Sequence, residues 1–247
     1  MKHLPISALF LGGLTLCGPL TLSAEVAPNP SMGAAPDQPL VQKLSGGDYQ
    51  IGKVRFNKDT RIITVPARTN VVNPDTIIEY LFVHLNGEKT HEALLTTEAD
   101  PTNINIALKL LNYKESQELF RIVNKDGTLS DKFPEPVEDI KKAARFDIYV
   151  TWLDKGVTKT RPITHWLRHT GNEQKMPNTP WVYNGSYVHG GKFKAKLTGS
   201  IIAILPDAGA IANYPGDDRN DDTLWAPAVN LPAERSELTV TIRPWKN

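Results

Sequence analysis

The stretch that decides the fold class is Arg145-Phe146-Asp147-Ile148-Tyr149-Val150-Thr151-Trp152-Leu153. Its apolar residues Phe146, Ile148, Val150 and Trp152 occupy every second position, and neighbouring side chains of a strand point to opposite faces. These four side chains therefore share one face, which indicates a strand with one side on a hydrophobic core. The turn formers Asp154-Lys155-Gly156 follow directly, so we expect the chain to reverse there.

Runs of the same character occur on both sides of this strand. Residues 49–56 and 60–66 are rich in β-branched side chains, and Asn57-Lys58-Asp59 between them predicts a β-hairpin. Further strands are expected at 76–85, 91–97, 181–187, 193–197, 200–205 and 237–243. Many strands and few helices predict a mainly β fold with one packed helix (α+β), built as an antiparallel sandwich or a barrel-like sheet.

Residues 100–113 depart from the alternation and predict the one long helix. Asp100 is a favourable N-cap residue, and Pro101 suits the first helical turn. Apolar side chains at steps of three and four residues form a single stripe along it: Ile104, Ala107, Leu108 and Leu111. Shorter helices are expected at 137–144 and 162–168.

Residues 1–24 predict a secretory signal peptide, with Lys2 near its start, an apolar run from Leu4 to Leu22, and small residues at Ser23-Ala24 for cleavage. The alternative is a membrane anchor, but prolines and glycines interrupt the run, and a spanning helix needs about 20 smoothly apolar residues. Residues 25–39 are rich in alanine and proline and predict a linker, which leaves 40–247 as the β-rich domain. The sequence thus predicts an exported protein, periplasmic or secreted, with no transmembrane segment in the mature chain.

The single cysteine, Cys17, lies inside the predicted signal peptide. A lipid anchor at Cys17 is not expected, because Leu16 stands where lipoprotein processing needs a small residue. The mature chain would then contain no thiol, which excludes a disulfide, an iron–sulfur cluster, a thiolate zinc site and a cysteine nucleophile. No cofactor is predicted.

The charge balance identifies no partner. Lysine and arginine number 28 against 27 aspartates and glutamates, and loss of Lys2 with the signal peptide leaves 27 against 27. No basic stripe stands out in the sequence, so nucleic acid and anionic membrane surfaces are not expected partners. The expected partner is an unidentified ligand or a protein of the cell envelope.

A series of short motifs, in order and spacing, resembles YdjY-domain proteins. The motifs are Thr90-His91-Glu92-Ala93-Leu94-Leu95, Asp100-Pro101, Trp152-Leu153-Asp154, Pro162, His165-Trp166-Leu167, Trp181-Val182-Tyr183-Asn184-Gly185-Ser186, Gly199-Ser200-Ile201-Ile202-Ala203-Ile204 and Pro215-Gly216-Asp217-Asp218-Arg219. The resemblance extends from about Val41 to Trp245, and it implies an exported bacterial protein with a β-rich domain and no settled activity. Some members are described as ferredoxin-like; this chain departs from that, because a mature chain without cysteine cannot hold an iron–sulfur cluster.

His91-Glu92 is the first candidate for chemistry, as a metal site or an acid–base pair. Neighbours in a strand point to opposite faces, so the two side chains would reach one ligand only if the backbone bulged. The residues after Glu92 also lack the second histidine of a zinc-protease helix. The alternative is structural, with both side chains hydrogen-bonded to hold the strand and the following loop.

Residues 217–222 form an oxygen-rich cluster in which Asp217, Asp218 and Asp221 are candidate cation ligands. The stretch does not match an EF-hand loop, because Thr223 stands where glycine is needed and Val229 where the bidentate glutamate should be. The alternative is a turn in which aspartate side chains bond local amides and Arg219 pairs with a carboxylate.

Aromatic residues form the third candidate site. Exposed rings in a groove could stack on sugars or peptides, with Trp166, Trp181 and Tyr183 as the ligand-binding candidates and Tyr187 and Trp225 beside them. The alternative is that these rings fill the core, since each buries roughly 150–250 Å².

The favoured function is non-catalytic: an exported envelope domain that binds a ligand or a partner protein. The sequence shows no complete catalytic constellation and no phosphate loop. Ser186 lies in Asn184-Gly185-Ser186-Tyr187-Val188, which is not the G-x-S-x-G pattern of a hydrolase nucleophile. The alternative is a metal-assisted hydrolase or isomerase, with His91 as ligand or base and Glu92 or the aspartates near Asp218 in support. A third possibility is a structural or assembly role in the envelope.

Overall fold

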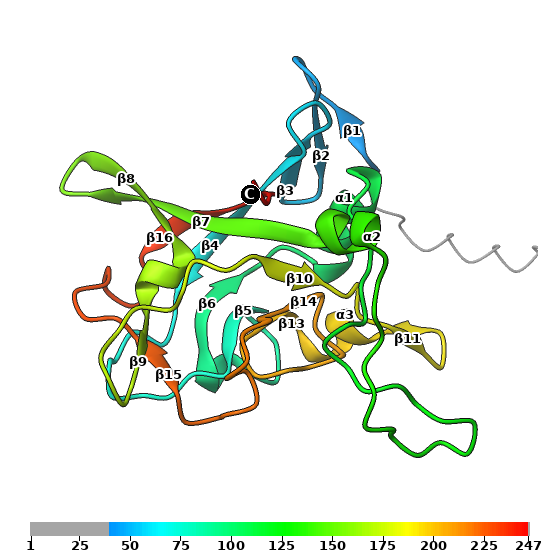
Figure 1. Ribbon diagram of the computed structural model, residues 1–247. Coiled ribbons are helices and arrows are strands. Elements are labelled where there is room, and N and C mark those ends of the chain that lie inside the picture. The colour runs from blue at the N-terminus through cyan, green and yellow to red at the C-terminus, as the bar shows by residue number, and fades with distance from the viewer. Residues whose placement is uncertain (1–39, 247) are drawn as a thin grey trace, which may run out of the picture. The chain divides into compact units, whose positions relative to one another are not determined.

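Eight strands within residues 40–246 close into a barrel (Figure 1). The structure is a computed structural model that describes residues 40–246; the predicted signal peptide and linker, with Cys17, lie outside the described residues. In order around the barrel, the strands are β4 (Ile62–Thr69), β16 (Glu237–Pro244), β7 (Arg145–Asp154), β10 (Trp181–Tyr183), β14 (Ala212–Asn213), β13 (Ser200–Ala203), β5 (Tyr80–His84) and β6 (Ala93–Thr97). β6 pairs with β4 and closes the ring. The prediction of a mainly β, barrel-like sheet is confirmed.

The strands β4, β16 and β7 form a regular antiparallel ladder that carries the alternation read from the sequence. Val240 of β16 lies opposite Val65 on one side and Val150 on the other, and all three side chains are buried. Thr241, the next residue along, lies opposite Thr64 and Tyr149 on the outer face. Because side chains alternate between faces, the barrel interior is apolar and the outer face of this ladder is rich in threonine.

Two pairings in the barrel are parallel, those of β13 with β14 and of β5 with β6. The expected strand at 91–97 begins only at Ala93, because residues Thr90–Glu92 form a short 3-10 helix, η1. The connection carries the chain back to the starting end of β5, so β6 runs beside β5 in the same direction rather than as the return arm of a hairpin.

The barrel extends beyond its ring at two places. β1 (Gln42–Lys43), β2 (Asp48–Ile51) and β3 (Val54–Asn57) continue the sheet from β4, while β8 (Val157–Pro162) pairs with β7. The predicted single strand at 49–56 is wrong: it is two strands, because Gly52 adopts a φ of +55° that supports a tight turn between β2 and β3. The two-stranded ribbons are β11 (Val188–His189) with β12 (Lys192–Phe193) and β15 (Trp225–Pro227) with β9 (Leu167–His169).

The helices are α1 (Pro101–Leu110), α2 (Glu138–Ala143), α3 (Lys194–Thr198) and the 3-10 helix η2 (Ile163–Trp166). The first two and η2 confirm the helices expected from the sequence, and α1 and α2 lie beside each other at the start of β7 (Figure 1). The strand expected at 193–197 is wrong, because good helix formers follow Phe193 and Gly199 ends the helix with a φ of +76°.

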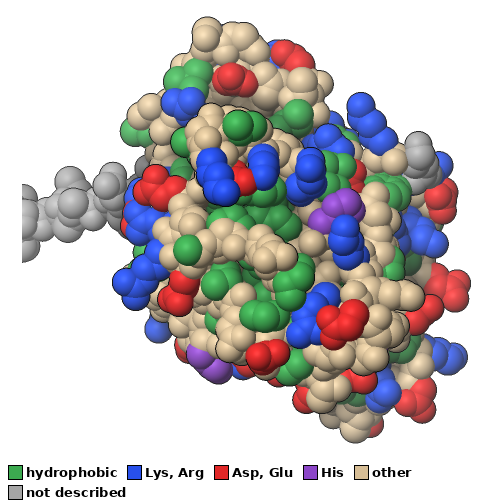
Figure 2. All heavy atoms as spheres, turned by 90° about the vertical axis from the view of Figure 1, so that its left-hand side faces the viewer, with side chains coloured by type: hydrophobic (Ala, Val, Ile, Leu, Met, Phe, Trp, Pro, Cys, Tyr) green, Lys and Arg blue, Asp and Glu red, His purple; other side chains and the backbone are tan. Residues whose placement is uncertain are grey.

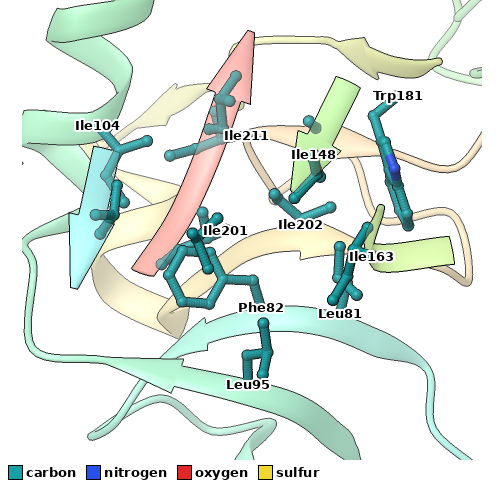
Figure 3. Close-up of a cluster of buried hydrophobic side chains, with 14 of the residues drawn as sticks. Leu81, Phe82, Leu95, Ile104, Ile148, Ile163, Trp181, Ile201, Ile202 and Ile211 are labelled. Carbon is teal, nitrogen blue, oxygen red and sulfur yellow. The ribbon is translucent and has the colours of Figure 1, made fainter. Parts of the chain in front are cut away.

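The core of the barrel is a continuous cluster of side chains from nearly every element. Phe82, Leu95, Ile201 and Ile202 project from β5, β6 and β13 toward one another, and Trp181 lies on the far side of the same cluster (Figure 3). Ile104 joins them from α1, so the apolar stripe read from the sequence is the face that α1 buries. The side chains available for chemistry are therefore those on the outer face and in the loops.

Asp100 is expected to stabilise the start of α1. Its carboxylate accepts a hydrogen bond from the Thr102 amide at 2.8 Å and lies 2.8 Å from Lys196 Nζ. Asp100→Ala should lower the free energy of unfolding by about 1 kcal/mol, while Asp100→Asn, which keeps the cap, should lose less. Urea unfolding followed by circular dichroism measures both; equal losses for the two variants would show that the ion pair, and not the cap, is what matters.

Candidate functional site

An open groove of about 950 Å³ crosses the outer face of the sheet from β6 to β8. We call it the outer groove and define it by residues that line it on five strands: Thr96, Pro66, Arg68, Glu237, Thr239, Thr151, Leu153 and Thr158. Every one of these strands pairs with the next, so the groove lies on a continuous piece of sheet.

The floor of the outer groove is set by strand register. Thr239 lies opposite Pro66 on β4 and Thr151 on β7, and Thr151 lies opposite Thr160 on β8. The hydroxyls of Thr151 and Thr160 are 2.9 Å apart and form a hydrogen bond. The floor therefore offers hydroxyl donors and acceptors in a row, next to the exposed apolar side chain of Leu153.

Charged side chains of both signs stand at the β6 end of the outer groove. Lys53 forms an ion pair with Glu98, and Arg68 lies 3.9 Å from Glu98 and 3.5 Å from Glu237. The hydrogen bond from Lys53 lowers the pKa of Glu98. Because these side chains are about half exposed or more, the pairs contribute little to stability and can rearrange for a ligand.

His91 and Glu92, the first candidates from the sequence, lie in η1 and not in a strand as expected. The His91 side chain is 71 % exposed, and its Nε2 is 3.8 Å from Glu92 Oε2. Glu92 is mostly buried, with Oε1 2.7 Å from Lys89 Nζ, and its backbone carbonyl accepts from the Glu79 amide. The pair lies outside the residues that line the outer groove, and the structural alternative describes the contacts of Glu92 best.

Around Lys89 the charges compensate one another. The hydrogen bond to Glu92 raises the pKa of Lys89, while burial and the nearby Glu92 carboxylate raise the pKa of Glu79. The Tyr80 hydroxyl donates to Asp207 at 3.1 Å, and the Lys89 ammonium lies 5.7 Å from the Tyr80 ring centre. A lysine held in its charged form beside a carboxylate serves as an ion-pair partner and not as a base.

The aspartates at 217–222 lie in the loop between β14 and β15. Asp221 accepts from the amide and hydroxyl of Thr223 at 2.9 and 2.6 Å, which is the local turn expected as the alternative to a cation site. Arg219 donates to the Gly216 carbonyl at 3.0 Å rather than forming the expected ion pair. Among the described residues, no three histidine, cysteine or acidic side chains lie together as a possible metal site. A cation held by Asp217, Asp218 and Asp221 gains no support from this arrangement.

Trp166, Trp181 and Tyr183 are 3 %, 1 % and 0 % exposed, so the prediction that they line a binding surface is corrected: they fill the core. The Tyr183 hydroxyl donates to Asn105 at 2.7 Å inside the protein. Trp225 is also buried, and Tyr187 is the member of the set with a large exposed surface. Trp181 and Tyr183 stand two positions apart on β10 and share a face, and this face is the inner one.

Ser186 and Asn184 carry structural hydrogen bonds. The Ser186 hydroxyl donates to the Gly209 carbonyl at 2.6 Å and accepts from the Ala195 amide at 3.1 Å, so it is fully used. Asn184 is buried and bonds to the side chain of Asn213 at 2.8 Å. This motif therefore joins loops, which fits its lack of a hydrolase pattern.

The outer groove was not predicted from the sequence. Its floor consists of threonines and a proline that are separated by up to about 170 positions in the chain, and none of them carries a recognisable motif. The signal that could have found it is the set of outward-facing positions on β4, β16 and β7, taken together.

Within the described residues, no helix combines the length and apolar character needed to cross a bilayer. Comparison with curated proteins and with solved structures found no match. The family model of the YdjY domain matches residues 54–243, which run from β3 to β16. Since this match covers well over half of its length, the chain belongs to the YdjY domain family.

Proposed function

We propose that the chain is an exported, non-catalytic binding domain that holds an extended ligand or a segment of a partner protein in the outer groove. The single observation that carries the proposal is the groove itself, with a volume of about 950 Å³ on a rigid antiparallel ladder. Ligand sites commonly have volumes of about 300–1,000 Å³ and combine apolar contacts with a few placed polar groups.

The lining of the outer groove suits a polar, extended ligand. Threonine hydroxyls at Thr239, Thr151 and Thr158 supply hydrogen-bond partners, and Pro66 and Leu153 supply apolar contact. The groove is open to solvent, so the ligand is not enclosed. The charges at the β6 end are paired with one another and set no strong preference for an ion.

Export supports the same function. The residues that predict it lie at 1–24, and the linker predicted at 25–39 would separate the domain from its point of export. A binding domain needs no cofactor and no thiol, in keeping with the composition of the predicted mature chain. The metal-assisted enzyme remains a prediction without a supporting observation, because His91 is exposed and Glu92 is paired with Lys89.

Filling the outer groove is expected to abolish binding. Thr239→Arg places a long side chain on the groove floor, whereas Thr241→Arg places the same side chain on the same strand and face outside the groove lining. The probes are a blocked neutral decapeptide of alternating threonine and serine, and cellotetraose. Binding is followed by amide chemical shifts of the full chain.

For at least one probe we expect shifts at Thr151, Leu153 and Thr158, with affinity about tenfold weaker in Thr239→Arg and unchanged in Thr241→Arg. Two outcomes contradict the proposal. One is that neither probe, at concentrations on the order of millimolar, moves the groove amides. The other is that both arginine variants bind alike.

A further inference from the structure

The strand β8 forms an open edge at one end of the outer groove. It pairs with β7 through the whole of its length, and residues Lys155 and Gly156 form the turn with φ values of +49° and +82°. Positive φ at both positions is typical of a two-residue type I′ turn. In such a hairpin the residues that flank the turn, here Asp154 and Val157, form a hydrogen-bonded pair. Bonded and non-bonded pairs then alternate, so the N–H and C=O groups of Thr158 and Thr160 point away from β7.

Apolar side chains flank this edge on the hairpin. Leu153 is 69 % exposed and Val157 is 60 % exposed, while Thr158 lines the outer groove. In Figure 1 the hairpin of β7 and β8 projects from the barrel. An exposed edge with free backbone groups and apolar neighbours is a surface on which another strand can pair.

Basic side chains gather along the same edge. Lys155, Lys159 and Arg161 lie on the hairpin, and His165 and Lys175 lie on the adjoining segments. Lys175 forms a β-bridge with Arg168 of β9, the strand that directly follows η2 and its His165. Burial lowers the pKa of His165, and the positive charges of Lys175 and Arg161 lower it further. Figure 2, which faces this side of the molecule, shows lysine, arginine and histidine side chains around an area of hydrophobic ones.

Most of these positive charges have no acidic partner in the described part of the chain. Lys159 forms an ion pair with Asp154, and Arg161 donates to the carbonyl of Thr160 at 3.1 Å. Lys155 and Lys175 are exposed and enter no ion pair of the described residues. A second copy of β8 would bring like charges together, so the edge is protected against pairing with itself and is complementary to an acidic strand.

We infer that β8 pairs with an extended acidic segment of a partner protein, which adds as a strand along Thr158 and Thr160. This inference rests on the proposed function and names its ligand class: a peptide that enters the outer groove from the β8 edge. Two features favour a peptide over an anionic polymer of another kind. One is the pair of outward N–H groups at Thr158 and Thr160 on β8, and the other is the apolar surface of Leu153 and Val157.

The test separates backbone pairing from charge attraction. Thr160→Pro removes the outward N–H of β8 and leaves the bonds between β8 and β7, because the Thr160 amide points to solvent. Thr160→Ser is the matched control that keeps the N–H. The probes are blocked decapeptides that alternate threonine with glutamate, serine or lysine, and polyacrylate with the same number of charges as the glutamate peptide.

With the full chain, the glutamate peptide is expected to bind at least tenfold more tightly than the serine peptide, and the lysine peptide more weakly than either, by fluorescence anisotropy at low salt. Thr160→Pro should weaken binding of the glutamate peptide at least tenfold, while the affinity of Thr160→Ser for this peptide should stay within twofold of the wild type. The double variant Arg161→Ala/Lys175→Ala, which leaves the backbone untouched, should remove most of the preference for glutamate over serine. This double variant tests the contribution of the basic side chains even if Thr160→Pro fails to fold.

The inference is overturned if polyacrylate binds as tightly as the glutamate peptide, since charge alone would then explain the affinity. It is also overturned if a folded Thr160→Pro protein binds as the wild type does. A chain that binds the serine peptide in the outer groove with no preference for glutamate refutes this inference and leaves the proposed function standing. A chain that binds neither these probes nor cellotetraose refutes both.

Discussion

Replacing Trp181 with alanine is expected to lower the free energy of unfolding by about 3–5 kcal/mol, because the ring lies in the barrel core and its removal leaves a cavity. Trp181 is 1 % exposed, and its ring centre lies 5.9 Å from that of Tyr214. Its strand, β10, pairs with β7 on one side and with β14 on the other, and Trp181 lies opposite Phe146 of β7. Urea unfolding of the full chain, followed by tryptophan fluorescence and circular dichroism, gives the change.

Tyr187 provides the control for the Trp181 variant. Its side chain is 45 % exposed, so Tyr187→Ala should change the free energy of unfolding by no more than about 0.5 kcal/mol. If the Trp181→Ala protein kept its stability and lost only its binding of the neutral decapeptide, Trp181 would be a ring that stacks on the ligand. The expected result is the reverse: lower stability, with binding retained by the molecules that remain folded.

The elements that the sequence predicted well are those with a long local period. β7 contains four alternating apolar positions and β16 three, and their observed bounds agree closely with 145–153 and 237–243. α1 has a cap, a proline at its start and an apolar stripe, and it forms within the expected range. In each case the side chains that define the period are also the ones that the barrel buries, so local preference and tertiary packing agree.

The missed elements depended on contacts between distant residues. The parallel pairing of β5 with β6 cannot be read from either strand, because a strand's own pattern does not state the direction of its neighbour. The stretch at 193–197 has an ambiguous pattern, and its helical form is completed where Gly199 approaches Gly87, a position far away in the chain. A short stretch of this kind, in which apolar residues alternate with lysines, takes the structure that its packing partners allow.

The candidate site could be predicted even less well, for a related reason. Residue types that suggest chemistry, such as Glu92 and Asp221, drew attention, but in the structure Glu92 forms an ion pair with Lys89 and Asp221 accepts hydrogen bonds within a local turn. The outer groove and the β8 edge consist mainly of threonines, a proline, a leucine and scattered charged residues. Their function would follow from register and from the absence of a neighbouring strand, and neither is a property of local sequence.

A second large effect is expected at Asn213, a buried residue of β14 at the centre of an amide network. Its Nδ2 donates to Asn184 Oδ1 at 2.8 Å and to the Asp207 carbonyl at 3.0 Å. Its Oδ1 accepts from the Asp207 amide at 2.7 Å. Asn184 in turn donates to the Ala210 carbonyl at 2.9 Å, so the two asparagines fasten the loop after β13 to the barrel.

Asn213→Ala is expected to lower the free energy of unfolding by about 3 kcal/mol. It leaves the Asp207 backbone amide and the side-chain Oδ1 of Asn184 without these partners inside the protein. Each buried unsatisfied group costs about 1–3 kcal/mol. Asn124 supplies a control, because it is exposed and its side chain bonds to Thr128 within a surface turn; Asn124→Ala should change stability by about 0.5 kcal/mol or less.

The double variant Asn184→Ala/Asn213→Ala then tests whether the two asparagines act as one unit. Once either amide is lost, the other has already lost its partner, so the double variant should be less destabilised than the sum of the single variants by about 1 kcal/mol or more. Strict additivity in urea unfolding would show instead that each asparagine acts only through its bonds to the loop backbone. In that case the contact of Asn184 with Asn213 contributes nothing to holding the loop between β13 and β14 in place.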